Sequence, residues 1–161
     1  STSMQGDMRF LNVLEKMGCD VKEERRGIRV TAPADGTLHG IEIDMNDFSD
    51  QTMTLAALAP FADSPTTIRN IGHIRLQESD RIHAIVTELA RLGVRVEEEQ
   101  DAVKIYPSDV KPAVVQTYDD HRMAMSFALI GLKVDGIVID NYECCKKTFE
   151  NYFDVLESIE E

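Results

Sequence analysis

Residues 74–82 read Ile74-Arg75-Leu76-Gln77-Glu78-Ser79-Asp80-Arg81-Ile82, with two acids, two arginines, an amide and a hydroxyl close together. Apolar side chains then recur at the spacing of one helical face, at Ile82, Ile85, Val86, Leu89 and Leu92. Ser79 and Asp80 precede this face and are suitable N-cap residues. Glu78 and Arg81 are therefore expected at or inside the first turn, where backbone N–H groups are unpaired. Taken alone, the stretch is explained by a capped helix with a solvated, charged first turn.

The elements expected around this stretch occur twice, with a period of roughly 70 to 75 residues. Each copy has a helix, two strands, a further strand, an apolar helix and a last strand. The first copy is expected at 8–17, 19–24, 28–30, 40–44, 53–62 and 66–70. The second is expected at 81–92, 94–99, 103–105, 114–115, a helix opening at Asp120, and 136–141. This pattern predicts duplicated α+β units, approximately 1–72 and 73–142, that share one core.

The ends of these copies carry further signals. Gly18 and Gly93 are expected to end the first helix of each copy. A polar loop is expected at 46–49, before the first apolar helix. A last amphipathic helix is expected at 148–159, without partner strands, so a third copy should lie elsewhere. The start at Ser1, without an initiator methionine, also suggests a fragment.

Composition restricts the class of protein. A chain of 161 residues suffices for one core-bearing domain or two small coupled units. The net charge of -12 disfavours non-specific nucleic-acid binding, because phosphate backbones need a basic face. No apolar run approaches the roughly 20 residues that span a bilayer, and the first residues lack the features of a signal peptide. A cytoplasmic protein is therefore expected. Cys19, Cys144 and Cys145 lack Cys-x-x-Cys spacing and are expected to be reduced and structural.

Charged residues gather where the expected helices begin. The two apolar helices open at Asp50 and Asp120, and two lysines precede the last helix. Helices packed side by side would place their N-termini on one rim, where unpaired N–H groups favour anions. Basic side chains would strengthen this anion site, namely Arg81, Arg122, Lys146 and Lys147. Because Asp50 and Glu78 add carboxylates for proton transfer, we expect acid–base chemistry on a phosphorylated or carboxylated small molecule, without metal.

Each of these residues also has a simpler explanation. Asp50 is equally well explained as an N-cap. Arg122 could simply pair with Asp119 or Asp120. The lysine pair at 146–147 would usually be solvated. Three histidines lack a shared ligand spacing, so no metal site is expected: His73, His83 and His121.

Two segments carry a more specific pattern, Arg75-x-x-Glu78-Ser79-Asp80-Arg81 and Tyr118-Asp119-Asp120-His121-Arg122-Met123-Ala124-Met125. Three shorter segments accompany them in order, Ser3-Met4-Gln5-Gly6-Asp7, Asp50-x-x-Met53-Thr54 and Lys147-Thr148-Phe149. Over essentially its whole length the chain thereby resembles the 5-enolpyruvylshikimate-3-phosphate (EPSP) synthase family, the 3-phosphoshikimate 1-carboxyvinyltransferases. The related UDP-N-acetylglucosamine enolpyruvyl transferases share the fold but not these segments.

The resemblance implies a fold and a partner. The family has two domains, each built of three βαβαββ units with helices buried and sheets outside, an inside-out α/β barrel. This chain, 1–161, would be a single fragment of the C-terminal domain, about two units plus a closing helix at 147–160. Its partner would be the N-terminal domain of the same enzyme. We expect a monomer that contacts neither nucleic acid nor membrane and needs no cofactor.

The resemblance also implies roles for single residues. Asp50 matches the proton acceptor at the shikimate 5-hydroxyl, and Glu78 matches the acid/base carboxylate near the enolpyruvyl methylene. Three cations match groups that hold phosphoenolpyruvate and the competing inhibitor glyphosate: Arg81, Arg122 and Lys147. His73 falls at a shikimate-phosphate contact that is often Asn. Gln77 stands where the family usually has Lys. The glutamine keeps a hydrogen-bond donor but loses the positive charge.

The implied reaction moves the enolpyruvyl group of phosphoenolpyruvate to shikimate 3-phosphate in aromatic amino acid biosynthesis. We expect the chain alone to be nearly inactive, because such a site normally closes between two domains. Two alternatives stay open. Gln77 suggests an enolpyruvyl transferase with a different acceptor, and the charged cluster alone would also suit a non-catalytic ligand-binding module.

Overall fold

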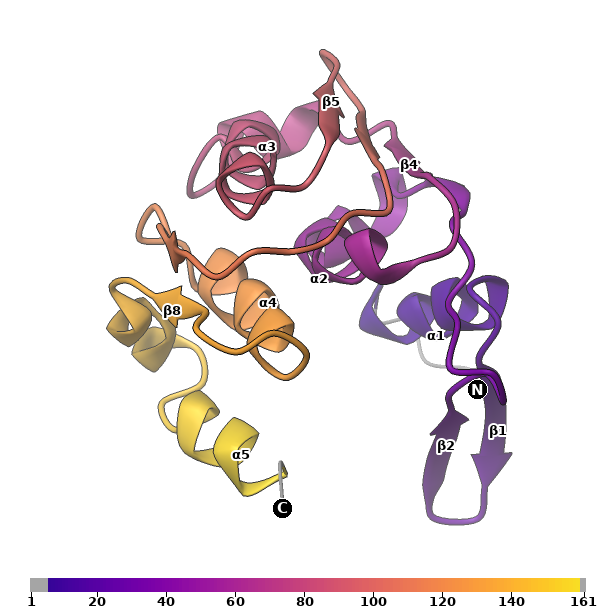
Figure 1. Cartoon of the computed structure of the whole chain (residues 1–161). Coiled ribbons are helices and arrows are strands. Elements are labelled where there is room, and N and C mark those ends of the chain that lie inside the picture. The colour runs from indigo at the N-terminus through magenta and orange to yellow at the C-terminus, as the bar shows by residue number, and fades with distance from the viewer. Residues whose placement is uncertain (1–5, 160–161) are drawn as a thin grey trace.

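A computed structural model describes residues 6–159, in which one order of helices and strands occurs twice (Figure 1). The first set is α1 (Gly6–Lys16), β1 (Asp20–Glu24), β2 (Gly27–Thr31), β3 (Glu42–Asp44), α2 (Thr52–Leu58) and β4 (Thr66–Arg69). The second set is α3 (Arg81–Arg91), β5 (Val96–Glu98), β6 (Val103–Ile105), β7 (Val114–Val115), α4 (His121–Gly131) and β8 (Val138–Ile139). The expected α+β class is confirmed. Of the segment at 3–7, residues 3–5 lie outside the described residues.

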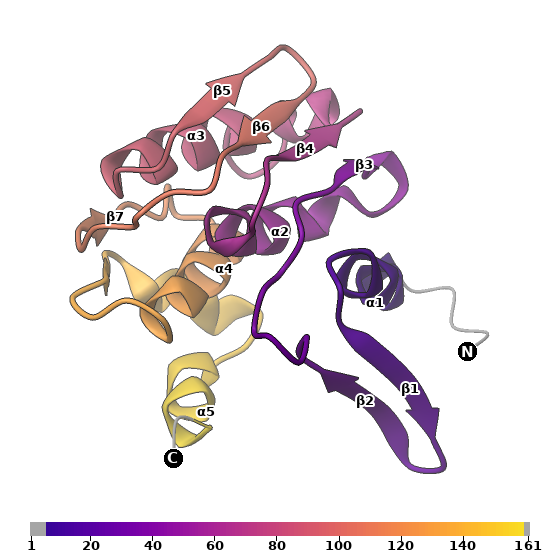
Figure 2. The same ribbon diagram turned by 45° about the vertical axis from the view of Figure 1, so that its right-hand side comes forward.

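The strands pair in the same way in both sets. β1 and β2 form an antiparallel hairpin, as do β5 and β6, whereas β3–β4 and β7–β8 are parallel pairs. The largest sheet has the order β3-β4-β6-β5, so the second hairpin adds to the last strand of the first set. Its register pairs Thr66 with Ile105. The β1–β2 hairpin instead forms a two-stranded sheet that projects from the body (Figures 1 and 2).

The core lies between the helices and this sheet. α2 carries no charged residue and packs against α4, with Thr54 Oγ1 3.2 Å from Ser126 Oγ across the contact. The four-stranded sheet covers α2 and α3 from outside (Figure 2), and Ile68 and Val103 point from it into the same core. Side chains of α2 and α4 are fully buried: Met53, Leu55, Met123 and Phe127. Each such side chain contributes about 1.5–3 kcal/mol of hydrophobic stabilisation. In this part of the fold the helices thus lie inside and the sheet lies outside.

The prediction for the last helix is wrong at its start. Residues Tyr142–Lys147 form a 3-10 helix, η4, and α5 covers only Tyr152–Ser158. The chain turns between them because the N–H groups of Thr148 and Phe149 both donate to the Cys145 carbonyl at 2.9 Å. The expected apolar face is therefore split, and no residue of α5 is buried. Residue 160 of the expected closing helix lies outside the described range.

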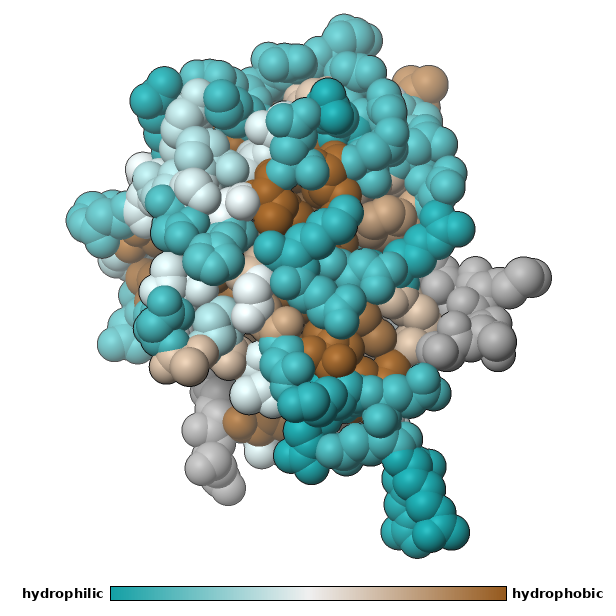
Figure 3. All heavy atoms as spheres, turned by 90° about the vertical axis from the view of Figure 1, so that its right-hand side faces the viewer, coloured by the Kyte–Doolittle hydropathy of each residue, from teal (hydrophilic) through white to brown (hydrophobic). Residues whose placement is uncertain are grey.

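The expectations for two helix-ending glycines and for reduced cysteines are confirmed. Gly18 and Gly93 follow the first helix of each set with left-handed φ angles of 103° and 78°. All three cysteines are free thiols, and Cys144 and Cys145 are buried. None of the helices in residues 6–159 is long and apolar enough to cross a membrane. The face that carries the β1–β2 hairpin shows patches of apolar surface between polar side chains (Figure 3).

Candidate active site

Two of the predicted helix caps are present. The side chain of Asp80 accepts a hydrogen bond from the His83 N–H at 3.0 Å and begins α3. The side chain of Asp120 accepts from the Arg122 N–H at 3.0 Å and begins α4. Both satisfy backbone donors that a helix N-terminus otherwise leaves unpaired. Arg81 is consequently fixed as the first residue of α3.

Two other positions were predicted wrongly in detail. Asp50 does not begin α2, because it lies inside a 3-10 helix, η1 (Asn46–Gln51), which also replaces the polar loop expected at 46–49. The cap position of α2 is Gln51, which makes no capping bond with its side chain. Lys147 does not precede a helix directly, since it lies in the last turn of η4. A short 3-10 turn has no strong sequence signal, so the pattern did not distinguish it from a loop or a helix start.

Arg81 lies at the centre of the charged cluster. Its side chain is only 3% exposed, and its Nε donates to Asp120 Oδ2 at 2.7 Å. Its Nη2 donates to Asp120 Oδ1 at 3.2 Å, which makes the pair bidentate. Its Nη1 donates to Asp50 Oδ1 at 3.2 Å and to the amide oxygen of Gln77. One guanidinium therefore joins the starts of α3 and α4 to η1.

Asp120 is a fully buried carboxylate with a complete set of donors. Besides Arg81 and the Arg122 N–H, the Ser79 hydroxyl donates to it at 3.0 Å. Burial raises the pKa of this carboxyl, but the bonds and charge of Arg81, the backbone N–H and Ser79 together hold its pKa below the ordinary value. The Asp120 side chain is thus ionised at neutral pH and neutralises much of the Arg81 charge.

Asp50 contacts a second arginine. Arg122 Nη2 lies 3.0 Å from Asp50 Oδ2, so the Asp50 carboxylate bridges Arg81 and Arg122. The alternative that the Arg122 side chain pairs with Asp119 or Asp120 is not observed, because only its backbone N–H reaches Asp120. Asp50 is 47% exposed and Arg122 is 29% exposed. Both side chains can therefore reach a ligand from solvent.

Glu78 organises the other half of the cluster. It lies before the Asp80 cap rather than in the first turn of α3. Its Oε2 is 3.1 Å from His121 Nδ1 and 3.3 Å from Lys147 Nζ. His121 was not among the predicted site residues. Two signals could have indicated it: its place beside the Asp120 cap, and its place inside the Tyr118–Met125 segment that carries the resemblance.

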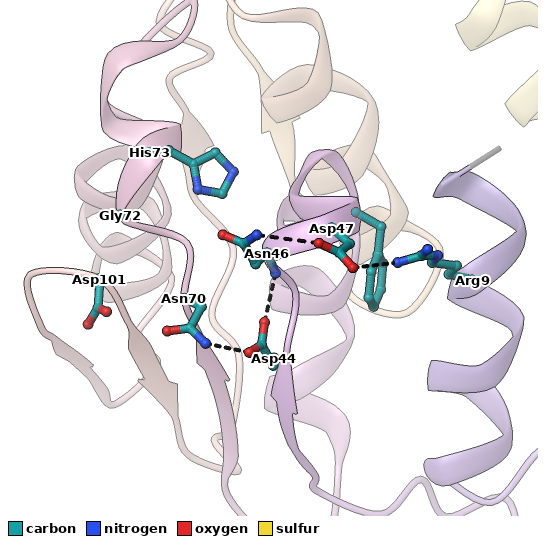
Figure 4. Close-up of a pocket in the computed structure, with 9 residues that line it drawn as sticks. Arg9, Asp44, Asn46, Asp47, Asn70, Gly72, His73 and Asp101 are labelled. Atoms are coloured by element: carbon teal, nitrogen blue, oxygen red, sulfur yellow. Dashed lines mark hydrogen bonds and ion pairs between the residues drawn. The ribbon is translucent and has the colours of Figure 1, made fainter. Parts of the chain in front are cut away.

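His73 lies apart from these contacts. Its Nε2 is 2.7 Å from the Ser49 hydroxyl, and its ring faces a pocket of about 680 Å³ (Figure 4). A second pocket, of about 460 Å³, contains Asp50, Gln77 and Arg122. Residues 46–48 line both pockets, so η1 separates His73 from the charged cluster. Among the predicted residues, the structure unites Asp50, Glu78, Gln77, Arg81, Arg122 and Lys147 at one edge and places His73 in the adjoining pocket.

One trio in the cluster has metal-ligand chemistry. Ligand atoms of Glu78, Asp120 and His121 lie within 4.8 Å of one another. Both Asp120 oxygens, however, already accept hydrogen bonds from Arg81. A cation here would have to displace that buried pair, so the trio does not fit a metal ion.

The arrangement can bind an anion and move protons. Two partly exposed cations, Arg122 and Lys147, each contact a partly exposed carboxylate, Asp50 or Glu78. An anionic ligand would compete for these cations and leave each carboxylate close to the bound molecule. The site thus combines accessible cations that can bind an anion with carboxylates that can exchange protons.

The fold is that of enolpyruvyl transferases. An EPSP synthase structure from Acinetobacter baumannii superimposes with a TM-score of 0.80 over 92% of this chain and 38% of that one, at 24% identity. The enolpyruvyl transferase NikO from Streptomyces tendae superimposes with a TM-score of 0.72 over 94% of this chain and 34% of that one, at 21% identity. At these identities the likeness establishes the fold alone.

The chain belongs to the EPSP synthase (3-phosphoshikimate 1-carboxyvinyltransferase) family, whose sequence profile matches residues 1–156. The 3-phosphoshikimate 1-carboxyvinyltransferase of Nostoc punctiforme is 59% identical over 151 residues, which are 94% of this chain and 35% of that protein. The chloroplastic enzyme of Brassica napus is 47% identical over 165 residues, 99% of this chain and 32% of that protein. The chain thus spans about a third of the length of these relatives.

Proposed function

We propose that this chain is the C-terminal part of a 3-phosphoshikimate 1-carboxyvinyltransferase, which transfers the enolpyruvyl group of phosphoenolpyruvate to the 5-hydroxyl of shikimate 3-phosphate. The observation that carries the proposal is the meeting of Asp50, Glu78, Arg81, Arg122 and Lys147 at one edge of the fold. Membership in the family supports it. The remaining polypeptide, an N-terminal domain, would supply the opposite wall of the site. We further propose that the complete enzyme is a monomer of the cytoplasm.

The cations have the properties that phosphoenolpyruvate requires. That substrate carries a phosphate and a carboxylate, which bind best to guanidinium and ammonium donors. Arg122 and Lys147 are the more accessible cations, and the buried Arg81 holds the Asp50 carboxylate beside Arg122. Donors fixed in advance stabilise charge in a transition state without reorganisation.

The carboxylates would divide the proton transfers between them. Glu78 donates a proton to the methylene carbon while the shikimate 5-oxygen bonds to the adjacent carbon, and Asp50 accepts the hydroxyl proton. This gives a tetrahedral intermediate. Loss of a methyl proton and departure of phosphate then restore the double bond, so the products are the enolpyruvyl ether and inorganic phosphate. The two carboxylates contact different cations, which allows them opposite roles.

Gln77 favours a second candidate within the same class, a transferase with a different acceptor. Its amide oxygen accepts a hydrogen bond from Arg81 within the cluster. The position therefore lacks the positive charge that the usual lysine would offer to an acceptor. His73, in the adjoining pocket, is held by Ser49. Both positions belong to the acceptor side of the proposed site.

Deuterium incorporation tests the role of Glu78. The chain is joined to the part of the Nostoc punctiforme enzyme that it does not cover, and the reaction is run in D₂O. The wild-type protein should place deuterium in the methylene group through the methyl intermediate, and Glu78→Gln should abolish it. Lys133→Gln, an exposed change outside the cluster, is the matched control. Undiminished deuterium incorporation in folded Glu78→Gln would contradict the proposed role.

A further inference from the structure

Glu88 is a fully buried carboxylate of α3 that the proposed chemistry does not use. Its Oε1 accepts a hydrogen bond from the Tyr118 hydroxyl at 2.9 Å, and its Oε2 accepts one from the Gln116 N–H at 2.9 Å. Arg91 Nε donates to Oε2 at 3.0 Å. Burial raises the pKa of the Tyr118 phenol, and the bond to the Glu88 carboxylate raises it further. The buried Glu88 side chain therefore holds the segment that precedes α4 through these hydrogen bonds.

The segment held by Glu88 has an unusual backbone. Tyr118 and Asp119 follow one another with φ angles of 56° and 55°. Residues other than glycine rarely adopt this left-handed conformation, and two in succession require support from their surroundings. The next residue is Asp120, whose carboxylate accepts hydrogen bonds from Arg81. The conformation of this short segment therefore sets where the Asp120 side chain lies.

Two supports of the segment come from one helix, in addition to the bond that Asn141 Nδ2 donates to Asp119 Oδ1 at 3.2 Å. Arg81 and Glu88 lie two turns apart on α3, which places them on the same face. Arg81 holds the segment downstream at Asp120, and Glu88 holds it upstream at Gln116 and Tyr118. A shift at the upstream support would be passed along the strained residues to the Arg81–Asp120 pair.

We propose that Glu88 is a positioning residue, which fixes Asp120 and thereby the Arg81 guanidinium at the anion site. The importance of this site for turnover rests on the proposed function. The positioning itself concerns only side chains of this chain, so it can be tested without substrate.

The test compares Tyr118→Phe and Glu88→Gln with Tyr106→Phe in the full chain. Tyr106 also donates its hydroxyl to a glutamate, Glu97 at 2.9 Å, but this bond is exposed to solvent. The readout is the hydrogen-exchange rate of the Arg81 Nε–H, measured by nuclear magnetic resonance. A general loss of stability would not accelerate the exchange of this one group selectively. Tyr118→Phe should accelerate this exchange about fivefold, the effect of one lost hydrogen bond.

The control and the outcomes separate positioning from stability. Tyr106→Phe should leave the Arg81 Nε–H rate unchanged, and Glu88→Gln should accelerate it more than Tyr118→Phe. If Glu88→Gln does not fold, Tyr118→Phe decides, since it removes one donor and leaves the carboxylate. An unchanged Arg81 rate in folded Tyr118→Phe would overturn the proposal. Failure of the proposed function would instead appear as absent turnover, with this exchange result intact.

Discussion

Arg81 Nε and Asp120 Oδ2 lie 2.7 Å apart and join the first turn of α3 to the first turn of α4. Both side chains are almost completely buried, with 3% and 0% exposed. Removing one partner of a buried pair leaves the other charge unpaired, which is strongly destabilising. The pair thus has a structural role beside its position at the candidate site.

Asp120→Asn should lower the free energy of unfolding by about 3–5 kcal/mol at neutral pH. Asn caps helices as well as Asp does, so the change removes the charge and keeps the cap. Urea unfolding followed by circular dichroism measures the difference. A loss below about 1 kcal/mol would show that the pair behaves like an exposed ion pair.

The difference in free energy of unfolding between wild type and Asp120→Asn should depend on pH. The folded state holds the pKa of Asp120 below its ordinary value, so ionised Asp120 stabilises the fold above the unfolded pKa of about 4. That stabilisation is lost as the pH falls through this value towards the folded pKa. The difference between wild type and Asp120→Asn should therefore shrink as the pH falls below about 5. A constant difference over this range would mean that the charge is not its source.

Gly40→Ala should destabilise the chain by about 1–3 kcal/mol through overpacking. A Cβ at Gly40 would lie 2.0 Å from the Ser64 carbonyl oxygen, which is backbone and cannot rotate away. Gly27→Ala is the matched control, because no atom lies within 4 Å of its Cβ position. In thermal unfolding, the melting temperature of Gly40→Ala should be well below that of Gly27→Ala. Equal melting temperatures would contradict the close approach of the two segments.

Gln77→Lys should tighten binding of shikimate 3-phosphate about fivefold in the joined protein, since a cation gains a charge-assisted bond to an anionic acceptor. The same change removes the hydrogen bond that Gln77 accepts from Arg81. Gln100→Lys adds the same charge at an exposed position outside the cluster and serves as control. Equal affinities for wild type and Gln77→Lys by calorimetry would show that residue 77 does not contact the acceptor.

Local signals predicted much of the fold. The caps at Asp80 and Asp120, the glycines at 18 and 93 and the uncharged α2 all follow from neighbours within a few residues. The internal similarity of the sequence also indicated the order of elements. These features depend on spacing along the chain, which a sequence displays directly.

The contacts between distant segments could not be predicted. Glu88 reads as an ordinary polar residue of an amphipathic helix, and nothing near it indicates a bond to Tyr118. The Ser49–His73 contact likewise joins two segments that meet only in the folded chain. The closing helix was misplaced because apolar spacing does not reveal the turn at 148.

We propose that this chain carries one wall of a carboxyvinyl transferase site. The direct measurement is phosphate release from phosphoenolpyruvate and shikimate 3-phosphate, by the chain alone and by the chain joined to the part of the Nostoc punctiforme enzyme that it does not cover. We predict almost no release from the chain alone, and turnover by the joined protein that Asp50→Asn abolishes. Turnover by the chain alone near the joined protein's rate, or a folded joined protein without turnover, would contradict the claim.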